Sequence, residues 1–287
     1  MKMILLLTDF SPAATSAAEA ALLLAQHMQL DLVLFNTYMK HMDLPSAIGA
    51  GWDVEEFSSR YQHSKLNMQA LTEGLEALSQ HDPDAYRPII RPVINDDELG
   101  MSVEELCRQY PIAFIVMGAM LHEGNTYIHE MNINAVIDIA NRPVLIIPES
   151  TNLLQYRKII FATAFSDADI YAMHFLTKLG RFLHYQIEVI HIKKEGEPDD
   201  EMRYRAFTAQ LAKIDYTGLH YKKVYAENVS IRLKHICEKE DALLALVHHH
   251  LSLFAKIFEH SVTKGAAANP LLPIIVLPAQ LSAYEHE

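Results

Sequence analysis

Residues 4–11 read Ile-Leu-Leu-Leu-Thr-Asp-Phe-Ser, and residues 159–166 repeat the pattern as Ile-Ile-Phe-Ala-Thr-Ala-Phe-Ser. A second block, Arg-Pro-Val-Leu-Ile-Ile-Pro at 142–148, returns as Leu-Pro-Ile-Ile-Val-Leu-Pro at 272–278. Two separated blocks that recur in the same order indicate two copies of one domain. We therefore predict domains at residues 1–150 and 151–287, and any functional site must be sought in both.

Each copy begins with a short apolar run that has no helical period and ends in a polar turn, which is typical of a strand buried on both faces. Similar runs follow at intervals, with helical stretches between them; the longest helix is expected at about 53–80, and another at 102–109. This alternation predicts an α/β, Rossmann-like fold with an open five-stranded parallel sheet in each half. Ligands of such sheets bind at the carboxyl ends of the strands.

The composition excludes some classes of partner. The net charge is −12, and residues 1–150 carry all of it, with 8 Lys and Arg against 20 Asp and Glu. An acidic half without a basic stripe disfavours nucleic-acid binding. No apolar run approaches the ~18–20 residues that cross a bilayer. The two cysteines, Cys107 and Cys237, are expected to be small buried apolar residues, and they fit a reducing, cytoplasmic compartment.

Three short motifs resemble those of universal stress proteins: Thr8-Asp9-Phe10-Ser11 after the first strand, Ile115-Val116-Met117-Gly118 at the fourth, and Pro143 to Pro148 at the fifth. The resemblance covers essentially the whole chain and implies two tandem domains of the adenine-nucleotide alpha-hydrolase type. Nucleotide-binding members of this family carry an Asp after strand one. After strand four they carry a loop of Gly, two residues, Gly, nine residues, Gly and a hydroxyl residue. Glycines there let backbone amides approach the phosphates.

The first half keeps part of this pattern. The resemblance implies four candidate nucleotide-binding residues in it: Asp9, Gly118, Gly124 and Asn132. However, Leu121 and Met131 stand where the family has its second and third glycines, and Asn132 replaces the hydroxyl residue. Two structural interpretations stay open beside the functional one, since Asp9 could be a cap or turn acceptor and Gly118 could simply permit a tight turn.

The second half has lost more of the pattern. Ala164 replaces the Asp, and bulkier residues replace the three glycines: Val247, His250 and His260. Only Ser261 keeps the identity that the family has. Each glycine replacement adds a Cβ where a phosphate needs bare backbone, so we expect ATP or AMP, if either binds, in the first half only.

Histidines form the most unusual local feature of the second half. His248 and His250 would share one side of an extended segment, and His191 and His260 could join them. Converging imidazoles suggest a zinc site. A pH sensor or an anion site formed by protonated histidines is a second interpretation. A histidine at the end of strand two is also common in the resembling family without any metal.

Catalytic motifs are missing: the sequence has no Gly-x-Ser-x-Gly elbow, Walker loop, cysteine metal knuckle or His-Glu-x-x-His helix. We therefore expect a non-enzymatic stress-response protein with degenerate phosphate loops, which binds a small molecule or a protein partner. Two alternatives remain, an adenine-nucleotide binder with at most slow hydrolysis in the first half and a metal or anion sensor in the second. The resemblance also implies that the fifth strands, 144–147 and 274–277, pair within the chain as an intramolecular pseudo-dimer, and further homodimerisation is left open.

Overall fold

The computed structural model describes residues 1–38, 54–119, 133, 135–194, 196, 200–248 and 272–279. The elements of the first half are β1 (Met3–Leu7), α1 (Pro12–Met28), β2 (Asp31–Thr37), α2 (Val54–Ser79), β3 (Ile90–Asn95), α3 (Leu99–Gln109), β4 (Ile112–Ala119) and β5 (Val144–Pro148). Residues 133 and 135–140 are also helical. Each strand expected from the first half of the sequence is thereby confirmed.

The second half repeats this order. Its elements are β6 (Lys158–Ala162), α5 (Asp167–Leu183), β7 (Gln186–Lys193), α6 (Glu201–Leu211), β8 (Leu219–Tyr225), α7 (Val229–Lys239), β9 (Ala242–Val247) and β10 (Ile274–Leu277). Between the halves a short 3-10 turn, η2 (Leu153–Gln155), is capped by the side chain of Asn152. The expected repetition of one α/β unit is therefore confirmed.

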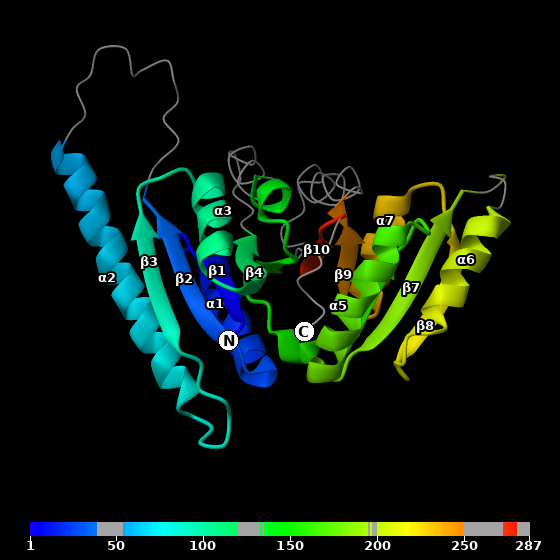
Figure 1. Cartoon of the computed structure of the whole chain (residues 1–287), viewed down its shortest axis with the longest axis horizontal. Helices are drawn as coiled ribbons and strands as arrows, with labels where there is room; N and C mark the ends of the chain where they lie inside the picture. The colour runs from blue at the N-terminus through cyan, green and yellow to red at the C-terminus, as the bar shows by residue number, and fades with distance from the viewer. Residues whose placement is uncertain are drawn as a thin grey trace, which may run out of the picture.

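The described strands form one ten-stranded sheet, in the order β3-β2-β1-β4-β5-β10-β9-β6-β7-β8. Each half contributes the same local order, and the second is reversed relative to the first (Figure 1). The halves join where β5 and β10 pair antiparallel, with Leu145 opposite Ile275. This junction confirms the expected intramolecular pseudo-dimer, and it pairs two strands that would otherwise be exposed edges.

Alternating side chains of the strands build a core on each face of the sheet. Ile4 and Leu6 belong to a cluster with residues of α1, α2, α5 and α6, whereas Leu5 and Leu7 belong to one with residues of α3 and α7. Successive strand residues point to opposite faces, and helices cover both faces, so a continuous apolar run is required. This explains why β1 shows no polar alternation.

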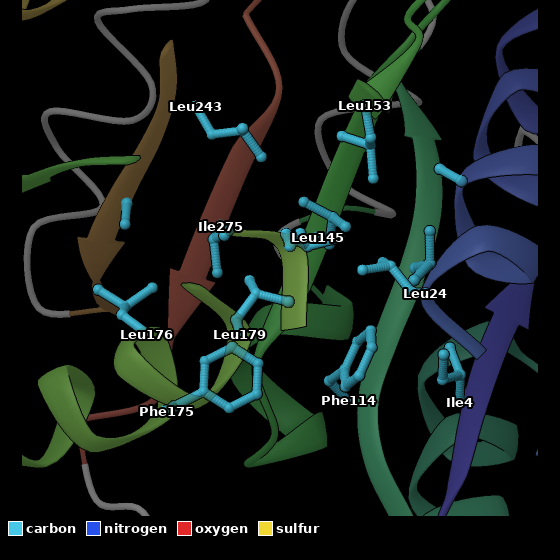
Figure 2. Close-up of a cluster of buried hydrophobic side chains, with 14 of the residues drawn as sticks. Ile4, Leu24, Phe114, Leu145, Leu153, Phe175, Leu176, Leu179, Leu243 and Ile275 are labelled. Atoms are coloured by element: carbon cyan, nitrogen blue, oxygen red, sulfur yellow. The ribbon is translucent and has the colours of Figure 1, made fainter. Parts of the chain in front are cut away.

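The first of these clusters runs across the junction between the halves. Figure 2 shows Leu24 of α1, Phe114 of β4 and Leu145 of β5 facing Phe175 and Leu179 of α5. The rings of Phe114 and Phe175 meet edge to face, with centroids 5.9 Å apart. The two halves therefore share one apolar core on this face in addition to the paired strands.

Both cysteines are free thiols in the structure, as expected. Cys237 on α7 is buried, and burial raises the pKa of its thiol. Cys107 on α3 is half-buried, and burial raises the pKa of that thiol to about 11. Thiols held in the neutral form behave as small apolar groups; the expected burial is confirmed for Cys237, whereas Cys107 is only partly buried.

Candidate functional site

The first candidate site lies where β1 turns into α1. Phe10 has a left-handed backbone, with φ 62°, and its amide donates to Thr8 Oγ1 at 3.0 Å. The side chain of Asp9 is exposed, and its Oδ1 accepts from the Ser11 amide at 3.0 Å. Ser11 in turn caps α1 through its hydroxyl, which accepts from the Ala14 amide. Asp9 is therefore an acceptor in the turn, and its carboxylate is at the same time open to solvent.

Asn36, near the end of β2, lies beside this turn and was not among the residues expected from the sequence. Its Nδ2 donates to the Thr8 carbonyl at 2.8 Å, and the residue is only 6% exposed. Its Oδ1 is buried without a hydrogen-bond partner in the described part of the chain. A buried carbonyl oxygen without a donor is costly, so this oxygen marks a place where a donor would be bound favourably.

The surroundings of this edge are acidic. Thr37 Oγ1 donates to the backbone carbonyl of Asp97, which follows β3. Burial, and then the neighbouring carboxylate of Asp96, raise the pKa of the Tyr38 phenol. The ends of β1, β2 and β3 therefore present acceptors and negative charge, which suits a donor-rich ligand better than a polyphosphate.

Gly118, at the end of β4, packs directly against α1. A Cβ placed on it would lie 2.6 Å from both the Ala13 carbonyl carbon and the Ala14 amide nitrogen. These are backbone atoms, which cannot rotate away. The need for a glycine here therefore follows from the close approach of a helix, without reference to a phosphate. This supports the structural interpretation of Gly118 over the functional one.

The second half keeps a carboxylate at the corresponding turn, but from a different residue. Ala164 occupies the Asp9 position, and Asp169 of α5 reaches back to the turn. Its Oδ2 accepts from Thr163 Oγ1 at 2.8 Å and from the amides of Ala164 and Ser166 at 3.0 Å each. Unlike Asp9, Asp169 is 0% exposed. The sequence signal was available, because Ser166 and Asp169 have the spacing of a capping box.

Aromatic rings fill the space beside this second turn. His191 in β7 occupies the position that Asn36 occupies in β2. Its Nδ1 lies 3.0 Å from the Thr163 carbonyl oxygen. The Phe165 ring stacks on His191, with centroids 4.1 Å apart, and also contacts Tyr204 and Phe207 of α6. Where the first half has an exposed carboxylate, the second has packed rings.

The two described histidines of the expected cluster have different partners. His248 Nε2 lies 2.7 Å from Asp138 Oδ1, in the helical segment before β5. His191 interacts with Thr163 and Phe165, and β6 separates β7 from β9 in the sheet. Among the residues with described positions, no group of three or more His, Cys, Asp or Glu side chains could hold a metal. The zinc site stays a prediction, since two of its four histidines were not described.

Several of the expected site residues lie outside the described residues. These are Gly124 and Asn132 of the first half and His250, His260 and Ser261 of the second. Leu121 and Met131, which replace glycines in the first phosphate loop, lie outside them as well. The interpretation of both phosphate loops as degenerate therefore continues to depend on the sequence.

Comparison with known proteins identifies the fold. The structure aligns with a universal stress protein from Archaeoglobus fulgidus at a TM-score of 0.68 and 14% identity, covering 96% of each chain. It also aligns with a protein of unknown function from Pseudomonas aeruginosa, at 0.53 and 13% identity, covering 97% of this chain and 92% of the other. A second P. aeruginosa protein, assigned provisionally to the universal stress proteins, gives 0.52 and 12% over 97% and 93%.

No protein-family model and no curated protein matches the sequence. The structural likeness extends over nearly the whole chain. The protein thus has the universal stress protein fold, in a chain of the length of two tandem units.

Proposed function

We propose that this chain is a non-enzymatic tandem universal stress protein that acts in the stress response by binding a ligand or a protein partner through its first half. The two units divide near residue 150, in the segment between β5 and β6. The proposal includes a cytoplasmic location, which the two free thiols support. No helix in the described ranges is long and apolar enough to span a membrane.

The difference between the two strand-one turns carries this proposal. In the first half the Asp9 carboxylate is exposed, and the neighbouring Asn36 Oδ1 has no donor within the described residues. In the second half the equivalent turn is occupied by Asp169, and Phe165 and His191 are stacked beside it. Ligands of open parallel sheets bind at this edge. Among the described residues at this edge, the exposed Asp9 carboxylate of the first half is the acceptor that a ligand can reach directly, and Asn36 Oδ1 lies buried beside it; we therefore assign the binding function to the first half.

An adenine nucleotide is the second candidate, as a ligand of the same turn. Asp9 and Asn36 present oxygens that suit the hydroxyl groups of a ribose or an exocyclic amine. The acidic surroundings disfavour the binding of three phosphate groups. Because the packing of α1 already accounts for a glycine at position 118, Gly118 does not support a phosphate loop. We therefore expect AMP or adenosine to bind more tightly than ATP, and we expect no hydrolysis.

Calorimetric titration with adenosine, AMP and ATP tests both candidates, after denaturation of the purified protein to identify any ligand carried through purification. Binding of at most one adenine ligand per chain is expected. Asp9→Ala and Asn36→Leu should each weaken it at least about fivefold, as expected for loss of one hydrogen bond to a buried or charged group. Glu19→Ala, on the exposed face of α1, is the matched control and should have no effect.

Two equivalent sites per chain, or full binding by the Asp9→Ala variant, would contradict the assignment to the first-half turn. If no adenine ligand binds, the nucleotide candidate is wrong and a protein partner or another small molecule remains. Release of inorganic phosphate from ATP in proportion to enzyme concentration, abolished in a first-half variant, would refute the non-enzymatic assignment.

A further inference from the structure

The turn between β6 and α5 has the geometry of an anion site. Phe165 has φ 63°, and its flanking residues, Ala164 and Ser166, direct their amides to one point, Asp169 Oδ2. Amides on either side of a left-handed residue form a concave nest that binds anions. Thr163 Oγ1 adds a third donor at 2.8 Å. Three donors on one oxygen are what a bound carboxylate or phosphate oxygen would receive.

The first half contains the same turn without an inward carboxylate. Ser11 and Ser166 are the N-caps of α1 and α5, so Ala14 and Asp169 are both the third residue after the cap. Phe10 and Phe165 share the left-handed backbone. In the first half one amide of the turn, that of Ser11, is satisfied by Asp9 from the solvent side. The turn is therefore common to both halves, and the second half has added an internal anion.

Asp169 is held there by more than helix capping. The residue is 0% exposed, and its second oxygen, Oδ1, is buried without a partner in the described part of the structure. A fully buried carboxylate is unfavourable unless strong hydrogen bonds compensate for its lost hydration. All three of the turn's donors act on Oδ2 alone, which makes this carboxylate an occupant of the site and more than a simple cap.

We propose that residues 163–166 form an anion-binding site whose natural occupant is Asp169, and that this internal ligand closes the second half to external anions. The chemical class that fits the site is a small carboxylate, such as formate or acetate, because it must replace one carboxylate of the protein. The proposal does not depend on what the first half binds.

Removal of the internal ligand and its chemical rescue test the proposal. Asp169→Ala should lower the Tm by roughly 5 °C or more, because it removes the acceptor of one buried and two part-buried donors. Sodium formate should restore a large part of this loss in a saturable manner, whereas sodium chloride at equal ionic strength should not. In the wild type, sodium formate and sodium chloride should have the same effect on the Tm. In the matched variant Asp9→Ala, at the exposed turn, the Tm should fall less, and formate should raise it no more than chloride does.

Amide chemical shifts give a second measurement that does not depend on stability. In Asp169→Ala, formate should shift the resonances of the Ala164 and Ser166 amides. If that variant does not fold alone, refolding from urea with and without formate replaces the melting experiment, and recovery of the fold only with formate would support the site. Equal effects of formate and chloride on the variant, or no refolding in either salt, would overturn the proposal.

Discussion

Substitution of Gly118 by alanine separates a packing role from a ligand-binding role. The added Cβ would lie 2.6 Å from two backbone atoms of α1 and 2.8 Å from a third, the Ala13 carbonyl oxygen. Ordinary contacts begin at 3.4 Å, so the first turn of α1 and the end of β4 must separate by about 0.8 Å, the difference between the two distances. Neighbouring strands and the rest of α1 are tightly packed and resist this movement.

The expected magnitude follows from two opposing terms. Forcing an extra methyl group into a close-packed contact costs about 1–3 kcal/mol. Replacing glycine by alanine where the backbone is compatible returns about 0.4–1 kcal/mol, because it restricts the unfolded chain. We therefore expect a net destabilisation of roughly 1–2 kcal/mol. In a chain of this size, with an unfolding entropy of roughly 0.6 kcal/mol/K, that corresponds to a Tm lower by about 2–3 °C.

Urea denaturation followed by circular dichroism, together with thermal melting, measures this loss directly. Gly74→Ala on α2 is the matched control: nothing lies within 4 Å of its Cβ position, so alanine should stabilise the exposed helix by about 0.5–1 kcal/mol. A Gly118→Ala protein as stable as the wild type would refute the packing argument. If the same protein also lost a ligand that the wild type binds, the functional interpretation of Gly118 would be restored.

Three further predictions concern the rest of the molecule. Lys158→Met should cost about 0.5–1 kcal/mol at pH 7, since Lys158 pairs with Glu240. The hydrogen bond from Lys158 lowers the pKa of Glu240 from 4.5. The stability that this ion pair contributes is therefore present above pH 4.5 and is lost as the pH falls through the lowered pKa. Urea titrations at pH 7 and pH 3.5 should show the stabilities of the wild type and the Lys158→Met variant converging in acid. Cys237, whose thiol pKa is raised by burial, should react with a disulfide reagent at least about 100-fold more slowly in the folded protein than in urea, and comparable rates would mean that α7 opens readily. Phe114→Leu and Phe175→Leu should show a coupling free energy of about 0.5–1.5 kcal/mol in a double-mutant cycle, and strictly additive losses would show that this edge-to-face pair does not link the halves.

The succession of strands along the chain was predictable because the responsible patterns are local and occur twice. Apolar runs without polar alternation identify strands covered on both faces. The junction of β5 with β10 was implied by the resemblance to universal stress proteins. The boundaries of α2 also agree with the expected helix. Helix α3 begins at Leu99, three residues before the expected start. Its first turn contains Gly100, which the end of the Ile139 side chain approaches closely, and no sequence pattern reveals that contact.

The candidate site was less predictable because its donors and acceptors come from different positions in the two halves. Position-by-position comparison matched Asp9 with Ala164 and therefore indicated a lost carboxylate. The structure places the Asp169 carboxylate at the same turn from five residues further along the chain. Likewise, Asn36 carries no motif, and its role is visible only from its bond to the Thr8 carbonyl. Sequence comparison follows residue positions, whereas the chemistry of a turn depends on which atoms reach it.

The two halves thus solve one structural problem in two ways, with different consequences for binding. A turn with a left-handed residue leaves backbone amides that need an acceptor. An acceptor in the turn itself, as in Asp9, satisfies an amide from the solvent side and leaves a charged oxygen accessible. An acceptor from the helix, as in Asp169, satisfies the amides from the inside and leaves no carboxylate oxygen exposed. On the proposed function, the position of this carboxylate in the loop or on the helix is one difference between the two halves, and the stacked rings of Phe165 and His191 beside the second turn are another.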